Sequence, residues 1–151
     1  LNYCCIIWAN PQKNNSLESI FTLQKRAVRI ITYSTFYAHT RPLFVKLSIL
    51  NIYNLYLKQI LLFVYKSLNN LIPSHCTHYF TKAKDVHSYN TRGHKHSLYI
   101  VYAKKRCRTA SFLSTGPKLW NKLPTSLQSA SSILVFKKLL KQHIIYLQSL
   151  S

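Results

Sequence analysis

Three groups of lysines and arginines are the residues of this sequence whose types and spacing could do chemistry, and that chemistry is the binding of phosphate. The groups are Lys25, Arg26 and Arg29; Lys104, Lys105, Arg106 and Arg108; and Lys137, Lys138 and Lys141. Such side chains contact phosphates and gain affinity by releasing the counterions condensed on a nucleic acid. The alternative for each group is a solvated helix face that binds nothing.

The charge balance of the chain favours phosphate binding. The 151 residues include 21 Lys and Arg but only two acids, Glu18 and Asp85, so the formal charge is +19. Because two carboxylates cannot neutralise that excess, the chain repels itself unless an anion lies against it. We expect that anion to be RNA or DNA. An anionic membrane surface and the acidic residues of a larger parent protein are the alternatives.

The shortage of acids also argues against an enzyme. Two-metal phosphoryl transfer needs clustered carboxylates, and Glu18 and Asp85 lie far apart in the sequence. Glycosidases and aspartic proteases need a carboxylate pair as well. A Cys–His or Ser–His enzyme is formally allowed, but no local signature for one is present. We therefore predict no catalytic residue and no cofactor.

Histidines and cysteines raise the question of a zinc site. The residues concerned are His75, Cys76, His78, His87, His94, His96 and Cys107. A structural zinc site needs closely spaced ligand pairs such as C-x-x-C. The chain has no such pair, so we expect no metal. The cysteines also lack a secreted-disulfide spacing and no secretory signal is visible, which predicts an intracellular protein of the nucleus or cytoplasm. The basic run from Lys104 to Arg108 fits a nuclear localisation signal.

Aromatic side chains offer a second way to contact nucleic acid. The chain has eleven Tyr, seven Phe and two Trp, and the bases of single strands stack on exposed rings. Most of these rings fall on apolar faces, so we expect the majority to pack in the core. Tyr99 and Tyr102, which lie beside the second basic group, are the candidates for stacking.

Helices are the elements expected to position these residues. The clearest helix runs from Ser16 to Thr32, with apolar residues on one half of its wheel and Lys25, Arg26 and Arg29 on the other. Glu18 lies in its first turn, where a carboxylate favours the helix dipole. One face of this helix is therefore expected to pack while the other presents three cations.

Four further helices follow from the same patterns. Thr40 can cap a short helix, and a helix from residue 51 or 52 to about residue 69 is apolar nearly all round, which indicates a central buried helix. The last helix begins near Ser131 or Ser132 and carries the third basic group beside its apolar stripe. Residues 118–123 form a short helix after a turn at Gly116-Pro117.

Together these elements predict a mainly α, compact helical domain of about four to five helices. Residues 97–113 are enriched in Tyr, Ile, Val, Thr and Phe, which allows a small β-hairpin there. We expect a single domain over residues 1–151, with a helical part at 1–80, a loop at 81–97, and short strands and terminal helices at 98–151.

Two features of the chain bear on its context. It contains no Met and its first residue is leucine, so we expect a fragment truncated at its N-terminus. The most apolar stretch, Ile52 to Val64, is interrupted by Asn54, Lys58 and Gln59 and is too short to cross a bilayer. We therefore expect no membrane partner.

Six stretches carry a resemblance to a known family. They are LQKRAVRIIT (Leu23–Thr32), AHTRPLFVKLSIL (Ala38–Leu50), FVYKSLNNLIP (Phe63–Pro73), HSYNTRG (His87–Gly93), GPKLWNKLP (Gly116–Pro124) and FKKLLKQ (Phe136–Gln142). In this order and spacing the chain resembles the region after the polymerase core in non-LTR, LINE-type retrotransposon reverse transcriptases of the jockey and chicken-repeat kind. The resemblance covers nearly the whole chain. It implies a helical segment on the thumb side of a polyprotein that copies its own RNA at a nicked chromosomal target.

The resemblance brings no catalytic residue with it. In that family the catalytic aspartates and the endonuclease precede this region, so the expected function is a non-catalytic C-terminal fragment of an RNA-directed DNA polymerase. It would assist RNA or DNA template binding, with the missing polymerase core as a partner. The alternatives are a structural segment that packs on the polymerase core and a translated transposon remnant with no activity.

Overall fold

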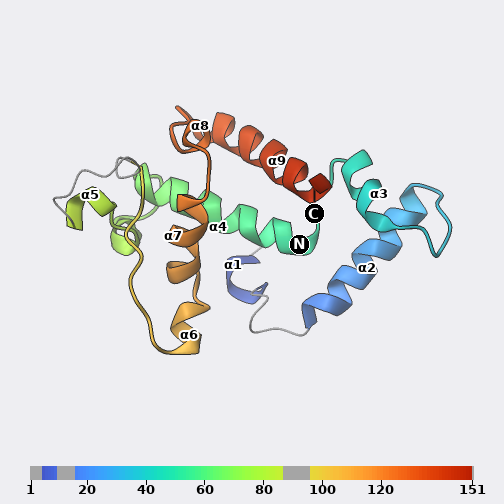
Figure 1. Ribbon diagram of the computed structural model, residues 1–151, viewed down its shortest axis with the longest axis horizontal. Coiled ribbons are helices and arrows are strands. Elements are labelled where there is room, and N and C mark those ends of the chain that lie inside the picture. The colour runs from blue at the N-terminus through green and yellow to red at the C-terminus, as the bar shows by residue number, and fades with distance from the viewer. Residues whose placement is uncertain (1–4, 10–15, 87–95, 151) are drawn as a thin grey trace. The chain divides into compact units, whose positions relative to one another are not determined.

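Helices build the part of the chain that the structure describes. The structure is a computed structural model and describes residues 5–9, 16–86 and 96–150. Its elements are α1 (Cys5–Trp8), α2 (Ser16–Ile31), α3 (Thr40–Lys46), α4 (Ile52–Leu68), the 3-10 helix η1 (Ser74–Tyr79), α5 (Ala83–Val86), α6 (Arg106–Thr109), α7 (Phe112–Asn121), α8 (Thr125–Gln128) and α9 (Ile133–Leu150) (Figure 1). The mainly helical class is therefore confirmed. The described residues form more helices than the four or five expected, and the additional ones are short.

These helices group into two units. The first unit comprises Leu1–Gln59 and Leu140–Ser151, and the second comprises Ile60–Leu139, so the division falls within α4 and within α9. Each unit has its own buried residues and is described separately below. The single domain expected from the sequence stays a prediction.

Two glutamine side chains hold the connection between α3 and α4 in the first unit. Gln24 of α2 donates from Nε2 to the carbonyl oxygen of Leu50 at 2.9 Å, and its Oε1 accepts from the backbone N–H of Ile52 at 3.0 Å. From α9, the Oε1 of buried Gln148 accepts from Asn54 Nδ2 at 2.8 Å. These bonds give the amide groups the partners that buried polar groups need. They also tie the start of α4 to α2 and to the last turns of α9.

Three helices end on residues with left-handed backbone conformation, although none of these residues is glycine. They are Tyr33, Ser48 and Asn70, with φ of 51°, 52° and 55°. At each end, the N–H of the residue that follows donates to a carbonyl five residues earlier, which is the Schellman motif. The left-handed conformation costs an L-residue about 1–2 kcal/mol. These ends are therefore stabilised by their hydrogen bonds and not by the residue type.

Packing in the second unit centres on α7. A Cβ on Gly116 would lie 3.0 Å from Val64 Cγ2 and 3.2 Å from Phe80 Cε1, so only glycine fits this approach without a shift of its neighbours. One turn further along, Trp120 is buried with its ring centroid 5.9 Å from that of Phe136. The turn expected at Gly116-Pro117 is therefore wrong: both residues lie inside α7, because tertiary packing outweighs the local signal.

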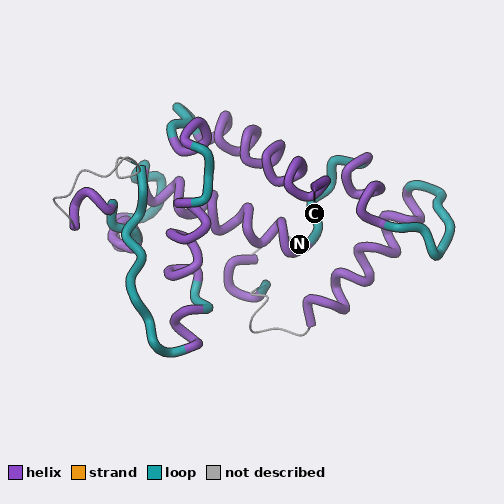
Figure 2. The backbone as a smooth tube through the Cα atoms, in the orientation of Figure 1, coloured by secondary structure: helices purple, strands orange, loops and turns teal. Residues whose placement is uncertain are grey.

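The hairpin expected around residues 97–113 is also wrong. Figure 2 shows no strand in the described residues, and Leu98 forms only an isolated bridge to Lys82. The bonds of this bridge run from the Ala83 N–H to the Ser97 carbonyl and from the Tyr99 N–H to the Thr81 carbonyl. The Asn121 side chain bonds both backbone groups of Leu98, donating to its carbonyl at 2.9 Å and accepting from its N–H at 2.8 Å. Ser111 caps α7, so the second half of the expected hairpin is helical. Strand propensity is context-dependent, and here an amide side chain replaces the second strand.

The long helices begin where the sequence placed them. Asn51 Oδ1 accepts from the backbone N–H of Asn54 at 2.8 Å at the start of α4, and Ser132 Oγ accepts from that of Val135 at 3.3 Å at the start of α9. Both contacts satisfy a free N–H of the first turn. The loop expected at 81–97 contains the short helix α5, and its residues 87–95 lie outside those described.

Candidate nucleic-acid interface

The first predicted group lies on the C-terminal half of α2, where its three cations differ in environment. Arg26 is exposed, whereas Lys25 and Arg29 are half-buried. Arg29 donates from Nε to the carbonyl oxygen of Ala38 at 3.0 Å, and its Cζ lies 5.8 Å from the centroid of the Phe36 ring. Arg29 therefore holds the connection between α2 and α3 in place. Arg26 makes no comparable hydrogen bond to this connection.

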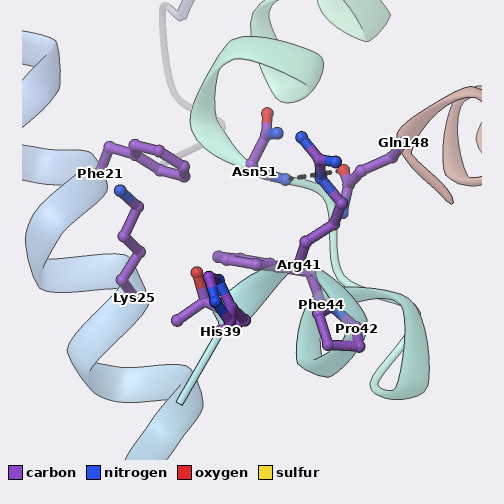
Figure 3. A pocket seen from close by; sticks show the side chains of 9 residues that line it. Phe21, Lys25, His39, Arg41, Pro42, Phe44, Asn51 and Gln148 are labelled. Atoms are coloured by element: carbon purple, nitrogen blue, oxygen red, sulfur yellow. Dashed lines mark hydrogen bonds between the residues drawn. The ribbon is translucent and has the colours of Figure 1, made fainter. Parts of the chain in front are cut away.

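Lys25 faces a different part of the first unit from Arg26. Its Nζ lies 4.1 Å from the centroid of the Phe21 ring, at a pocket of about 530 Å³ that His39 and Arg41 also line. Figure 3 shows Lys25 and Arg41 extending into this Lys25 pocket from opposite sides, with His39 between them. None of its described lining residues is a carboxylate. The arrangement suits an anionic group such as a phosphate.

His39 and Arg41 were not among the site residues expected from the sequence. Each is a lone basic residue at the start of α3, and a lone basic residue carries no pattern. The structure brings them to Lys25 because the α2–α3 connection folds back, with Asn51 and Gln148 closing the pocket through a 3.4 Å hydrogen bond from the Asn51 N–H to Gln148 Oε1 (Figure 3). Only their presence in one of the family-like stretches could have drawn attention to them.

The second predicted group lies in an irregular segment that leads into α6. Lys104, Lys105 and Arg108 are exposed, and Arg106 belongs to α6 with its side chain outside the described set. Of the two tyrosines expected to stack bases, Tyr102 is exposed and Tyr99 is half-buried. The exposed members of this group can reach phosphates without rearrangement.

The third predicted group lies on α9. Lys137, Lys138 and Lys141 are all exposed and lie within about one turn of each other. Residues three and four apart share a face of a helix, so their ammonium groups form a local row of positive charge. Each of the three groups thus stays on its own element.

The described residues offer few other sites. They contain no group of three His, Cys, Asp or Glu side chains that could hold a metal ion; His87, His94 and the side chain of Cys107 lie outside them. No described helix has the length and apolar character needed to cross a membrane. Comparisons of the chain with protein-family models, with curated proteins and with solved structures found no match.

Proposed function

We propose that this chain is a non-catalytic C-terminal segment of a retrotransposon RNA-directed DNA polymerase that assists RNA or DNA binding through phosphates. One observation carries the proposal: the predicted cations are mostly exposed in a chain that has almost no acids. The exposed members are Arg26, Lys104, Lys105, Arg108, Lys137, Lys138 and Lys141.

Charge compensation is the physical reason. The formal charge is +19, and the only acids, Glu18 and Asp85, are themselves exposed. Because two carboxylates cannot pair with so many exposed cations, mobile counterions must offset most of the positive charge. A bound polyanion is the partner that reduces the self-repulsion of the chain most. Binding then gains free energy from the counterions that the nucleic acid releases.

The family-like stretches supply the second support. In the stretch Gly116–Pro124, Gly116 packs closely on α4, Trp120 is buried, and Asn121 holds the backbone of Leu98. Residues of this stretch therefore make the contacts expected of a folded unit and not of a drifting tail. The proposed polymerase origin itself rests on the resemblance.

Salt dependence of binding tests the proposal. Labelled RNA and DNA of mixed sequence would be titrated with the intact chain between about 50 and 200 mM salt, and log K plotted against log salt concentration. Replacing Lys104, Lys105 and Arg108 by glutamine should weaken binding to every sequence. It should also reduce the slope by about 2–3, because each phosphate contact contributes about 0.7–0.9.

A charge-conserving variant provides the control. Lys104→Arg, Lys105→Arg and Arg108→Lys together keep the charge and should leave both affinity and slope close to those of the unchanged chain. Equal affinity at low and high salt would contradict the proposal. So would equal slopes for the glutamine variant and its control.

A second function is favoured by the exposed apolar side chains. Leu23, Ile30 and Ile31 of α2 are exposed in the described part of the chain. Leu23 and Ile30 lie about two turns apart on one side of this helix, and clustered exposed apolar residues mark protein interfaces. A segment that packs on a polymerase core would cover such residues. Under this alternative the isolated chain is poorly soluble and the upstream core restores its solubility. Failure of the core to do so would count against it.

A further inference from the structure

Three aromatic rings in the connection between α2 and α3 lie open to solvent. The exposed fractions are 98% for Tyr33, 66% for Phe36 and 90% for Tyr37. Aromatic side chains usually bury most of their large surface, so three neighbouring exposed rings are unusual. The centroids of Phe36 and Tyr37 lie 5.3 Å apart at an interplanar angle of 89°. The two rings therefore meet edge to face, and Arg29 Cζ lies 5.8 Å from the Phe36 centroid, so Tyr33 and Tyr37 are the most open of the three rings.

The same surface is basic. Arg26, Arg29, Tyr33 and Phe36 line one hollow of about 560 Å³ together with Ile30, and none of its described lining residues is a carboxylate. We call this set, together with the exposed ring of Tyr37 that contacts Phe36, the Tyr33 surface. Its hollow brings two guanidinium groups and two exposed phenyl or phenol rings together, whereas the phenyl rings that line the Lys25 pocket, Phe21 and Phe44, are half-buried and buried.

The helix end sets the position of Tyr33. The Ser34 N–H donates to the Arg29 carbonyl at 3.0 Å and the Tyr33 N–H donates to the Ile30 carbonyl at 3.1 Å, which places Tyr33 in the left-handed conformation. Arg29 in turn holds the backbone of Ala38. The ring is thus carried into solvent by a backbone that hydrogen bonds already hold, so binding has to immobilise the side chain of Tyr33 but not its backbone.

We propose that the Tyr33 surface binds single-stranded nucleic acid, with bases stacked on Tyr33, Phe36 and Tyr37 and phosphates held by Arg26. This inference rests on the proposed function and specifies that the nucleic acid bound at the Tyr33 surface is single-stranded. Stacking requires an unpaired base face, which a duplex does not offer, and it is tolerant of sequence because every base has one. Charge complementarity separates this occupant from an apolar protein, since two arginines flank the rings.

The test uses Tyr33→Gly in the intact chain. Glycine adopts the left-handed conformation without strain, so the variant should unfold at a temperature no lower than the unchanged chain. Its affinity for a labelled single-stranded RNA should fall by about 5- to 140-fold, the range that corresponds to the loss of one base–ring stack. Affinity for a duplex RNA of the same length should be unchanged.

Ser48→Gly is the matched control, because Ser48 has the same backbone conformation at the end of α3 and no ring. It should leave affinity for both RNAs unchanged. Tyr37→Ala provides a second variant and should also weaken single-strand binding alone.

The outcomes separate this inference from the proposed function. If Tyr33→Gly and Tyr37→Ala change single-strand affinity by less than about twofold while salt-dependent binding persists, the stacking inference is overturned and the proposed function stands. If the unchanged chain binds neither RNA in a salt-dependent way, the proposed function fails as well. Equal losses for single strand and duplex would also overturn stacking.

Discussion

Replacing Gly116 by alanine adds one methyl group where α7 lies closest to its neighbours. That methyl would lie 3.0 Å from Val64 Cγ2 and 3.2 Å from Phe80 Cε1, whereas carbon atoms in good contact are about 3.5–4.0 Å apart. Val64 and Phe80 are both buried, so neither can turn into solvent to make room. We therefore expect Gly116→Ala to lower the free energy of unfolding of the second unit.

Two opposing terms set the magnitude. Overpacking a well-packed core costs about 1–3 kcal/mol, while alanine is favoured over glycine inside a helix by about 1 kcal/mol. The net loss should therefore be about 0–2 kcal/mol. Urea denaturation measures it through the fluorescence of buried Trp120, with every variant made in a Trp8→Phe background so that Trp120 is the reporter.

A double-mutant cycle with Val64→Ala tests the cause. Val64→Ala removes the nearest methyl and by itself destabilises the chain by leaving a cavity. In the double variant the new methyl of residue 116 occupies that space, so the combined loss should be smaller than additive by about 0.5 kcal/mol or more. The packing argument is refuted if Gly116→Ala stabilises the chain and if the effects of the two substitutions on the free energy of unfolding are additive.

Two further predictions concern the first unit. Gln148→Leu should lower the free energy of unfolding, measured by urea denaturation, by about 1–3 kcal/mol, because it removes the acceptor of Asn54 Nδ2. The control Gln142→Leu, on the exposed side of α9, should change this free energy by less than about 0.5 kcal/mol. Equal effects of the two substitutions would contradict the prediction. Burial raises the pKa of the Cys5 thiol above its ordinary value of 9.0. The unfolded chain therefore ionises first, so the stability that the Cys5 thiol contributes should be fully present below pH 9 and lost as the pH rises through the raised pKa. Cys5→Ala should remove this part of the alkaline loss, while the part from Tyr56, whose pKa burial also raises, should remain. Identical alkaline stability profiles for the two chains would exclude this assignment.

The long helices were predictable because their signals are local. Apolar spacing, Asn51 ahead of α4 and Ser132 ahead of α9 all act within a few residues, and the structure uses both side chains as caps. Such signals depend on the helix itself and not on what packs against it. Sequence patterns therefore located these elements to within one or two residues.

The expected hairpin and the expected Gly-Pro turn were wrong because non-local contacts decide both places. Leu98 lies opposite Lys82 in an isolated bridge, and both of its backbone groups bond to the side chain of Asn121; both residues are distant in sequence. Gly116 lies inside a helix because it fits against Val64 and Phe80. The local propensity of a segment for strand or turn does not report which distant residues contact that segment in the folded chain.

The candidate site was predictable in charge and not in geometry. Arg26 and Arg29 belong to one basic group in the sequence, but Arg29 is bonded to the Ala38 carbonyl and Arg26 is exposed. Lys25 lies at a pocket with His39 and Arg41, which no spacing rule connects to it. The reversal of the chain between α2 and α3 creates these differences, and its course depends on tertiary contacts.

Tyr33 illustrates how a helix end can create a binding surface. Ser48 and Asn70 occupy the same position at the ends of α3 and α4 and are also exposed. Exposure of Tyr33 is therefore no argument for binding by itself. The chemistry differs among the three ends: serine and asparagine place a short polar group there, whereas tyrosine places a stacking face beside Arg26. Comparison of Tyr33→Gly with Ser48→Gly isolates that difference, because both substitutions relieve the same backbone conformation and only one removes a ring.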